Sequence, residues 1–350
     1  MENKIVKKDF EEILDSNVPF EKFNNKTFFI TGATGLIGSL IIKFLLFLNE
    51  KGMNINIVGL IRNEKKAQQI YKNYNDKHLN FYVHNLGSGT ISYDKEIDYI
   101  VHGAAITQSQ MMIEKPVETI LLSVDGTNEL LDLATRKNVK SMVYISSMEV
   151  YGQPISDEKI KEDNLGKLAL TNIRSGYPES KRLCENLCVA YADEYGLNVS
   201  SARLAQTFGA GILPSENRVF AQFARSIINE EDIVLHTLGN SEGNYIYTSD
   251  MIKAIFTLLL YGESGQAYNV TNEQNHMTIK QMAELVEKNF GNKKSHVRID
   301  IPEKNMGYAP DVKMWLSNKK LRNLANGVWS PTVNMTEMYS RLIDYLRLTK

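Results

Sequence analysis

A tyrosine and a lysine spaced for one helical face are the residues in this sequence best suited to chemistry. The segment Tyr177-Pro-Glu-Ser-Lys181 puts a phenol and an ammonium four positions apart, so on a helix they lie on the same face. A nearby cation favours the phenolate and lowers its pKa toward working pH, which suits proton exchange with an alcohol. Ser146 and Ser147 end an apolar run about thirty residues earlier, where a hydroxyl can hydrogen-bond that alcohol or the carbonyl formed from it. Taken alone, the spacing would also fit a surface Tyr–Lys pair.

Three glycines near the start of the chain predict a phosphate-binding turn. The segment FFITGATGLIGS leads from an apolar strand through Gly32, Gly35 and Gly38 into a helical pattern. The first glycine permits a tight turn, the second lets the backbone approach a pyrophosphate, and the third allows close helix–strand packing. The free N–H groups of the helix then face the phosphates. The alternative is a turn that is only structural. The contacts expected with a dinucleotide are Gly32, Thr34, Gly35, Leu36, Ile37 and Gly38.

Alternating strands and helices must position these residues. Apolar strands are predicted at Thr27–Thr31, Ile55–Leu60, Asn80–His84, Tyr99–His102, Met142–Ser146 and Val199–Leu204. Helical segments are predicted at Gly38–Lys51, Glu64–Tyr74, Val117–Asn138 and Pro178–Tyr195, with Gly52 and Gly196 placed as C-terminal caps. Strands that are apolar throughout and separated by helices predict an α/β fold, a Rossmann-type doubly wound parallel sheet.

The chain divides into three predicted parts. Residues 1–24 look like an amphipathic helical extension with no assignable chemistry, and residues 25–206 form the NAD(P)-binding Rossmann domain with the Ser, Tyr and Lys. From residue 207 the alternation becomes irregular, with helices near Val219–Asn229, Asp250–Tyr261 and Thr278–Asn289. Residues 207–350 are therefore expected to form a smaller C-terminal α/β part that binds substrate over the carboxyl edge of the sheet.

Composition excludes several classes of protein. Lys and Arg number 40 against 41 Asp and Glu, a net charge of -1, so no overall field favours nucleic acid or an anionic membrane. Cys184 and Cys188 are too few for a disulfide framework, and the six histidines are scattered, so no metal site is expected. The charged N-terminus lacks the apolar core of a signal peptide, and Leu40–Leu48 is too short to span a bilayer. We expect a cytoplasmic protein.

Several motifs together resemble the extended short-chain dehydrogenase/reductases, the NAD-dependent epimerase/dehydratase family that acts mainly on nucleotide sugars. TGATGLIG resembles the cofactor loop of that family, and His102–Ala105 (HGAA) resembles its strand-end motif beside the cofactor. Ser146–Gly152 (SSMEVYG) resembles the active-site strand, YPESK the catalytic Tyr/Lys pair, and Tyr247–Met251 (YTSDM) an element of the substrate domain. The resemblance covers about residues 25–290.

The resemblance implies a role for each matching residue. Ser147 stands where the family has its catalytic Ser or Thr, Tyr177 is the base, and Lys181 binds the nicotinamide ribose. Ala104 and Ala105 are expected to line the cofactor. Family members commonly form homodimers through a four-helix bundle, and the matching segments here carry apolar residues on more than one face. The residues noted on these segments are Leu121, Leu130, Leu133, Leu183, Leu187 and Tyr191.

Glu149 bears on which reaction is catalysed. The 4,6-dehydratases of the family carry Thr-Asp-Glu on the active-site strand, whereas this chain has Ser147-Met148-Glu149. The glutamate is kept and the acid that protonates the leaving hydroxyl is absent, which is closer to the UDP-glucuronate decarboxylases. Simple 4-epimerases usually have a small residue at this position. The alternative is that Glu149 is an ordinary polar residue at a strand end.

Two arginine positions bear on the ligands. The second strand ends in Arg62 with no acidic residue, so a guanidinium is available for a 2′-phosphate, and NADP is slightly favoured over NAD. Arg62 stacked on adenine or facing solvent is the alternative. Family members usually carry a diphosphate-binding arginine where this chain has Gly243, while Arg218 resembles a second phosphate contact and is retained. The loss leaves room for a smaller sugar phosphate.

These motifs lead to one main hypothesis and two alternatives. The main one is an NAD(P)-dependent enzyme that oxidises or reduces a hydroxyl or ketone of a nucleotide sugar, as an epimerase, dehydratase or decarboxylase, in the synthesis of surface polysaccharide precursors. The first alternative is an NADPH-dependent reductase of a phosphorylated ketose. The second is a non-catalytic NAD(P)-sensing regulator on the same fold.

Overall fold

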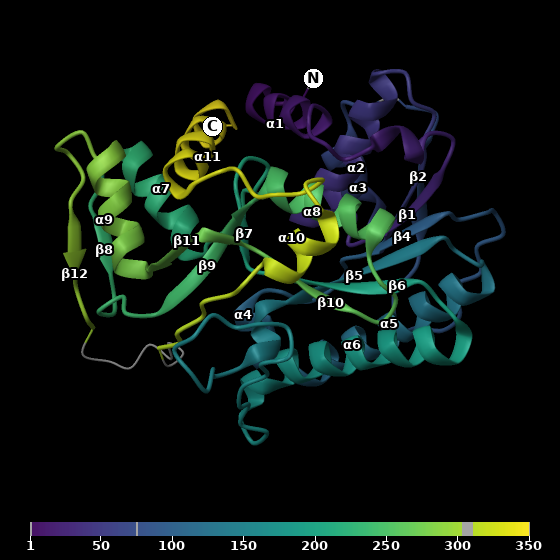
Figure 1. Cartoon of the computed structure of the whole chain (residues 1–350). Helices are drawn as coiled ribbons and strands as arrows, with labels where there is room; N and C mark the ends of the chain where they lie inside the picture. The colour runs from purple at the N-terminus through teal and green to yellow at the C-terminus, as the bar shows by residue number, and fades with distance from the viewer. Residues whose placement is uncertain (1, 75, 303–310, 350) are drawn as a thin grey trace.

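A parallel sheet of seven strands forms the centre of the molecule. The computed structural model describes residues 2–74, 76–302 and 311–349. The strands run in the order β10-β6-β5-β4-β1-β2-β3 and each neighbouring pair is parallel, which confirms the predicted doubly wound sheet (Figure 1). Their bounds are β1 Thr27–Thr31, β2 Asn56–Ile61, β3 Leu79–Val83, β4 Tyr99–His102, β5 Ser141–Ser147, β6 Val199–Leu204 and β10 Ala267–Val270.

Helices cover both faces of this sheet. Figure 1 shows α5 and α6 together below the sheet, with α2 and α8 above it. Alternation along β1 explains the two layers, because Phe28 and Ile30 are buried with the α2 and α8 side chains and Phe29 with those of α5 and α6. The helices around the sheet are α2 Leu36–Glu50, α3 Glu64–Tyr71, α4 Ser109–Glu114, α5 Pro116–Arg136, α6 Gly176–Tyr195 and α8 Thr248–Tyr261. The short 3₁₀ turns η2 Met148–Tyr151 and η3 Ile173–Ser175 lie between β5 and α6.

Local sequence explains where these helices begin and end. Pro116 occupies the first turn of α5, where its missing N–H costs nothing. Gly196 ends α6 with φ 68°, and Gly52 follows α2 with φ 97°, so both predicted caps adopt the left-handed backbone that glycine tolerates. No helix within the described residues is long and apolar enough to cross a membrane.

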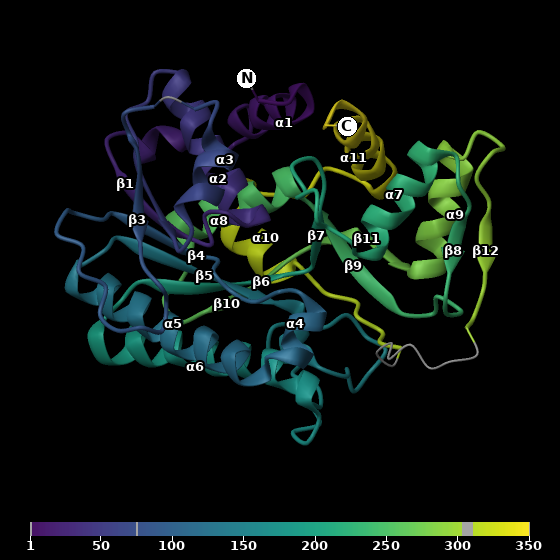
Figure 2. The same ribbon diagram turned by 180° about the vertical axis from the view of Figure 1, so that it is seen from behind.

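The C-terminal elements form a smaller lobe beside the sheet's carboxyl edge. In Figure 2, the view from behind, α7, α9, β8 and β12 stand together on the right. This lobe contains β7 Gln206–Phe208, α7 Val219–Asn229, β8 Ile233–Leu235, β9 Glu242–Tyr247, β11 Asn272–Thr278, α9 Ile279–Phe290, β12 Val297–Ile299 and α11 Met335–Thr349. The chain also returns to the main sheet as β10, beside α10 Lys319–Ala325. The boundary at residue 207 therefore remains a prediction, since the large sheet takes a strand from beyond it.

The N-terminal extension contains a helix that packs against the C-terminal helix. The segments α1 Lys4–Leu14 and η1 Phe20–Phe23 bury apolar side chains against the core, as the amphipathic pattern predicts. Asp9 of α1 is buried, accepts a hydrogen bond from the Tyr247 hydroxyl (2.7 Å) and pairs with Arg341 of α11 (2.5 Å). Glu12 and Glu337 contact the same guanidinium. The two ends of the chain are thus held together by buried charge.

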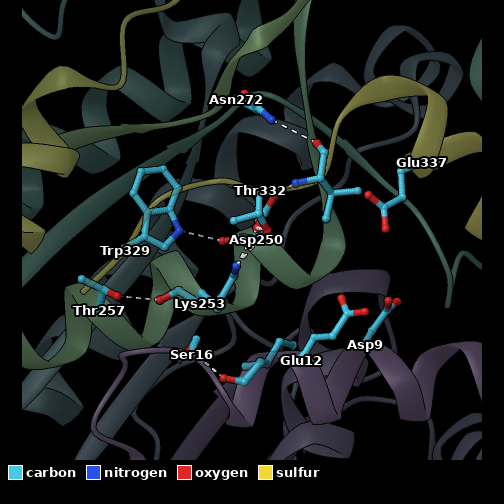
Figure 3. A network of polar contacts seen from close by, with 12 residues as sticks. Asp9, Glu12, Ser16, Asp250, Lys253, Thr257, Asn272, Trp329, Thr332 and Glu337 are labelled. Atoms are coloured by element: carbon cyan, nitrogen blue, oxygen red, sulfur yellow. Dashed lines mark hydrogen bonds and ion pairs between the residues drawn. The ribbon is translucent and has the colours of Figure 1, made fainter. Parts of the chain in front are cut away.

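Asp250 anchors the segment that leads to α11. Its carboxylate is fully buried and accepts hydrogen bonds from the backbone N–H groups of Thr332 (2.9 Å) and Val333 (3.0 Å), and pairs with Lys253 at 2.8 Å. Its carbonyl oxygen accepts a bond from the Trp329 indole (2.9 Å). Figure 3 shows this group above the carboxylates of α1. Asp250 belongs to the YTSDM motif, so in this chain the motif links α8 to the segment that leads to α11.

The apolar residues expected on more than one face of α5 and α6 divide into buried and exposed ones. Leu130 and Leu133 are fully buried against their own sheet and offer no surface to a partner. Leu121 and Leu183 are 51% and 47% exposed, and Val117 is 61% exposed. The exposed apolar side chains therefore lie in the N-terminal part of α5 and along α6, where Val189 and Tyr195 are also exposed.

The buried Asp9 should make stability depend on pH. Burial raises the pKa of Asp9 to about 6 from 3.8, although Tyr247 and Arg341 oppose the rise. A folded-state pKa above the unfolded one means that this contribution is present below about pH 4 and is lost as pH rises through about 6. In chemical unfolding, wild type should lose roughly 2–3 kcal/mol relative to Asp9→Asn over that interval.

Arg341→Met provides the matched variant for this measurement. It removes the guanidinium that opposes the effect of burial, so the pH-dependent loss should become larger than in wild type. A wild type that gains stability relative to Asp9→Asn as pH rises from 4 to 6 would contradict this account of Asp9.

Candidate functional site

One cavity at the carboxyl edge of the sheet brings the predicted site residues together. Its volume is about 370 Å³, and it lies where β1 and β4 end and their connections diverge to opposite faces. Every residue named from the sequence as a cofactor, catalytic or substrate contact lines it. These are Gly32, Thr34, Gly35, Leu36, Ile37, Gly38, Arg62, Ala104, Ala105, Ser147, Glu149, Tyr177, Lys181 and Arg218.

The glycine turn has the geometry of a phosphate cradle. Gly32 has φ 69°, and a Cβ there would stand 2.7 Å from the carbonyl oxygen of Gly103. A Cβ on Gly38 would overlap the carbonyl of Gly32. Gly35 is the N-cap of α2, so the first free N–H groups of that helix face the cavity. Glycine is required at Gly32 and Gly38, and the cradle fits a dinucleotide pyrophosphate.

A fully buried histidine supports the opposite wall of this cradle. The Thr31 hydroxyl accepts a bond from the Ala104 N–H (3.1 Å) and is hydrogen-bonded to His102 Nδ1 at 2.7 Å. On the other side of the ring, His102 Nε2 is hydrogen-bonded to the Thr127 hydroxyl at 3.1 Å. Burial lowers the pKa of His102 to about 3, so the ring stays neutral. The HGAA motif thus fixes the chain beside the cavity.

Tyr177 and Lys181 take their expected places on the first turns of α6. Both side chains are buried, and the ammonium lies 5.9 Å from the centre of the Tyr177 ring. Lys181 Nζ donates to the carbonyl oxygen of Ile145 (2.7 Å) and stands over the Tyr144 ring at 4.6 Å. Burial lowers the pKa of Lys181 to about 8.

The expected fall in the Tyr177 pKa is wrong for the protein without ligands. Burial raises the pKa of Tyr177 well above its ordinary value, the Glu149 carboxylate raises it further, and a hydrogen bond with Ser147 opposes them. The phenol is therefore neutral at rest.

The structure separates the roles of the two serines. Ser146 donates to Glu185 at 2.5 Å, and Glu185 is in turn bound by Arg203 at 2.7 Å, so the Ser146 hydroxyl is engaged behind the site. Ser147 accepts from the Glu149 N–H (3.2 Å) and contacts Tyr177. Ser147 is thus the serine available to a reacting group.

Arg174 is a residue of the site that the sequence analysis missed. Its Nη2 lies 2.8 and 3.0 Å from the two carboxylate oxygens of Glu149, and its guanidinium stands 5.6 Å from the centre of the Tyr177 ring. Its Nη1 is buried and has no partner among the described residues. The available signal was its place three residues before Tyr177, one helical turn away.

The far end of the cavity is cationic. Arg62 lies there as predicted, and Lys66, four positions later on the first turn of α3, lines the same wall. The spacing of four was the signal for Lys66. His84 also lines this end, with its Nε2 3.2 Å from Glu129. This end of the cavity can therefore hold an anionic group.

On the substrate side, Arg218 lines the cavity. The second arginine that family members usually carry is Gly243 in this chain. Arg218 stands at the N-cap of α7 and forms an ion pair with Glu216 at 2.6 Å. Gly243 lies on β9 opposite Met277. Within the described residues no group of three or more His, Cys, Asp or Glu is placed to hold a metal ion, and Cys184 and Cys188 are buried free thiols.

Comparison with known proteins gives relatives over most of the chain. This chain is 26% identical over 327 residues to UDP-glucuronic acid decarboxylase 1 of Danio rerio, and the match covers 92% of this chain and 73% of that protein. The dTDP-D-glucose 4,6-dehydratase of Homo sapiens is 24% identical over 92% of this chain and 90% of its own length. A UDP-N-acetylglucosamine 4-epimerase from Methanobrevibacter ruminantium, solved with UDP-N-acetylmuramic acid, has the same fold, with a TM-score of 0.78, 20% identity, and coverage of 93% and 100% of the two chains.

The family follows from a match that is independent of any single relative. The sequence profile described as the NAD dependent epimerase/dehydratase family matches residues 28–271, from the first strand of the sheet to the end of β10. The matched span includes the glycine cradle, the active-site strand and the Tyr/Lys helix. This chain belongs to the NAD-dependent epimerase/dehydratase family.

Proposed function

We propose that the protein modifies a nucleotide sugar, with Tyr177 exchanging a proton with a sugar hydroxyl whose carbon is oxidised. The observation that carries the proposal is the convergence of Ser147, Tyr177 and Lys181 with the glycine cradle in one cavity. When bound in that cradle, a nicotinamide dinucleotide supplies hydride transfer. A complete set of proton-transfer residues disfavours the non-catalytic regulator.

The residues of the chain divide the work of proton transfer. Ser147 orients the sugar oxygen, and Tyr177 takes its proton once positive charge beside the ring lowers its pKa. The Lys181 ammonium donates one hydrogen bond to the Ile145 carbonyl and lies over the Tyr144 ring. Its remaining donors are therefore available to the ribose and the phenol. Burial of both side chains excludes water from the proton path.

Glu149 and Arg174 support a step after the oxidation. The Arg174 guanidinium holds both oxygens of the Glu149 carboxylate, and so fixes a carboxylate that lines the cavity. Glu149, retained beside Ser147 and Tyr177 in the cavity, favours a decarboxylase-type reaction over plain epimerisation. The relatives named decarboxylases agree with that choice, whereas reduction of a phosphorylated ketose finds no such support.

The base assignment is tested with Tyr177→Phe. Turnover of a panel of UDP- and dTDP-sugars should fall by about a hundred- to ten-thousand-fold, because only the proton-transfer group is lost. Cofactor affinity should stay almost unchanged, whereas Lys181→Met should lower both quantities. Product formed by wild type with no net change in NAD(H) indicates an internal redox cycle. Near-normal turnover by the Phe variant would rule out the assigned base.

We also propose that the cationic end of the cavity favours NADP(H). Arg62→Ala should weaken NADPH binding by about ten- to hundred-fold, since a charge-assisted hydrogen bond contributes roughly 1.5–3 kcal/mol. NADH binding should change little. Calorimetric titration of both cofactors measures this. Equal losses for the two cofactors, or a wild type that prefers NADH, would refute the 2′-phosphate contact and leave NAD as the cofactor.

The apolar side chains that are exposed on α5 and α6 support a homodimer. A helix with apolar residues both on its own sheet and on its outer side is best buried by a second copy. Leu121→Arg combined with Leu183→Arg should give a monomer in sedimentation at micromolar concentration. Leu238→Arg, at another exposed leucine, serves as the control and should stay dimeric. A monomeric wild type would contradict the proposal.

A further inference from the structure

The Arg218 guanidinium is oriented by its neighbours before any substrate arrives. Its Nε donates to Glu216 Oε1 (2.9 Å) and its Nη2 to Glu216 Oε2 (2.6 Å), a bidentate pair along one edge of the fork. Its flat face lies 4.9 Å from the centre of the buried Phe220 ring, which stacks on Phe208 at 4.4 Å. One edge and one face are thus fixed by the protein.

The other edge of the fork remains for a ligand. A guanidinium has five N–H donors, and Glu216 takes one on Nε and one on Nη2. One donor on Nη1 and the second on Nη2 are left, because the other Nη1 donor bonds Gln206 Oε1 at 3.4 Å. Gln206 and Arg218 line the cavity together. The unused edge therefore points along the wall that a substrate would touch.

Glu216 lies behind this arrangement. Its side chain is 14% exposed against 47% for Arg218, and it stands outside the set of described residues that line the cavity. Its Oε1 also accepts the Arg218 N–H (3.0 Å), which ties the carboxylate to the N-terminus of α7. Glu216 is thus anchored by backbone and cannot follow a flexible arginine into the cavity.

We propose that Glu216 is a positioning residue of the substrate site, which holds the Arg218 guanidinium so that its Nη1/Nη2 edge meets a substrate phosphate. The inference rests on the proposed function, a nucleotide-sugar substrate, and on the phosphate contact that the family resemblance implies for Arg218. An arginine that is free to rotate would lose most of its bidentate contacts, although its charge would remain.

The test is a double-mutant cycle on ligand binding. UDP and dTDP, the probes, are titrated by calorimetry into wild type, Glu216→Gln, Arg218→Ala and the double variant, each saturated with NAD. Glu216→Gln should weaken the better-bound probe by about threefold to thirtyfold, the coupling expected of residues in contact. In the Arg218→Ala background the same change should have no effect, since nothing is left to position.

Two further variants separate orientation from charge and from folding. Arg218→Lys keeps the charge but cannot form the fork, and should bind the probe about as weakly as Glu216→Gln. Glu230→Gln, at the C-terminal end of the same helix, breaks an exposed pair with Lys294 and should bind normally. NAD affinity should be unchanged in all variants, which a misfolded protein would not show.

The outcomes distinguish this inference from the proposed function. If Arg218→Ala weakens the probe and Glu216→Gln does not, or tightens it, the positioning role is wrong and the substrate contact stands. If Glu216→Gln weakens binding equally with and without Arg218, the positioning role is also wrong. If wild type binds neither probe, or Arg218→Ala binds as wild type does, the assigned phosphate contact fails and the inference fails with it.

Discussion

Backbone lies directly against backbone where β1, β4 and α2 meet, and the cavity owes its shape to this contact. Gly32 has room for no Cβ beside Gly103, and Gly38 has none beside Gly32. Side chains at these positions would push the helix away from the strands and fill the space in which a pyrophosphate fits. The buried Thr31–His102–Thr127 bonds keep the same walls in place from behind.

Buried charges organise the rest of the molecule around that crevice. Lys181 is buried but bonded to a carbonyl and set on a tyrosine face, while Glu185 and Arg203 satisfy each other beneath Ser146. The Asp250 carboxylate accepts hydrogen bonds from backbone N–H groups of the C-terminal segment. The Asp9 carboxylate accepts them from the Tyr247 hydroxyl and the Arg341 guanidinium. A buried ion without such partners would cost several kcal/mol. These pairings tie the sheet, the smaller lobe and both chain ends into one unit.

Much of the fold could be predicted because its signals are local. Six strands of the sheet and the flanking helices follow from apolar runs, and the caps at Gly52 and Gly196 follow from glycine placement. The strand β10 was missed because it is short and lies beyond the irregular region, where only tertiary pairing with β6 defines it. Which apolar residues of α5 and α6 stay exposed could not be predicted, because helical periodicity alone does not say how much of each helix the sheet covers. Leu130 and Leu133 are buried by it.

The candidate site shows the same limit. Its residue list follows from motifs, whereas its electrostatics do not. The pKa of Tyr177 is raised because burial and Glu149 outweigh any nearby cation, and no spacing rule reports burial. Arg174 and Glu216 were missed because each acts through a partner whose distance is set by the fold.

The central claim is that a nucleotide sugar bound in the cavity is oxidised by the nicotinamide cofactor while Tyr177 takes the proton of its hydroxyl. Rapid mixing of the NAD-loaded wild type with UDP- and dTDP-sugars, followed at the absorbance band of reduced nicotinamide, tests this most directly. The account predicts a transient rise in that band that then decays as product forms, and no rise in Tyr177→Phe. Product formation without any reduced nicotinamide, or an equal transient in the Phe variant, would contradict it.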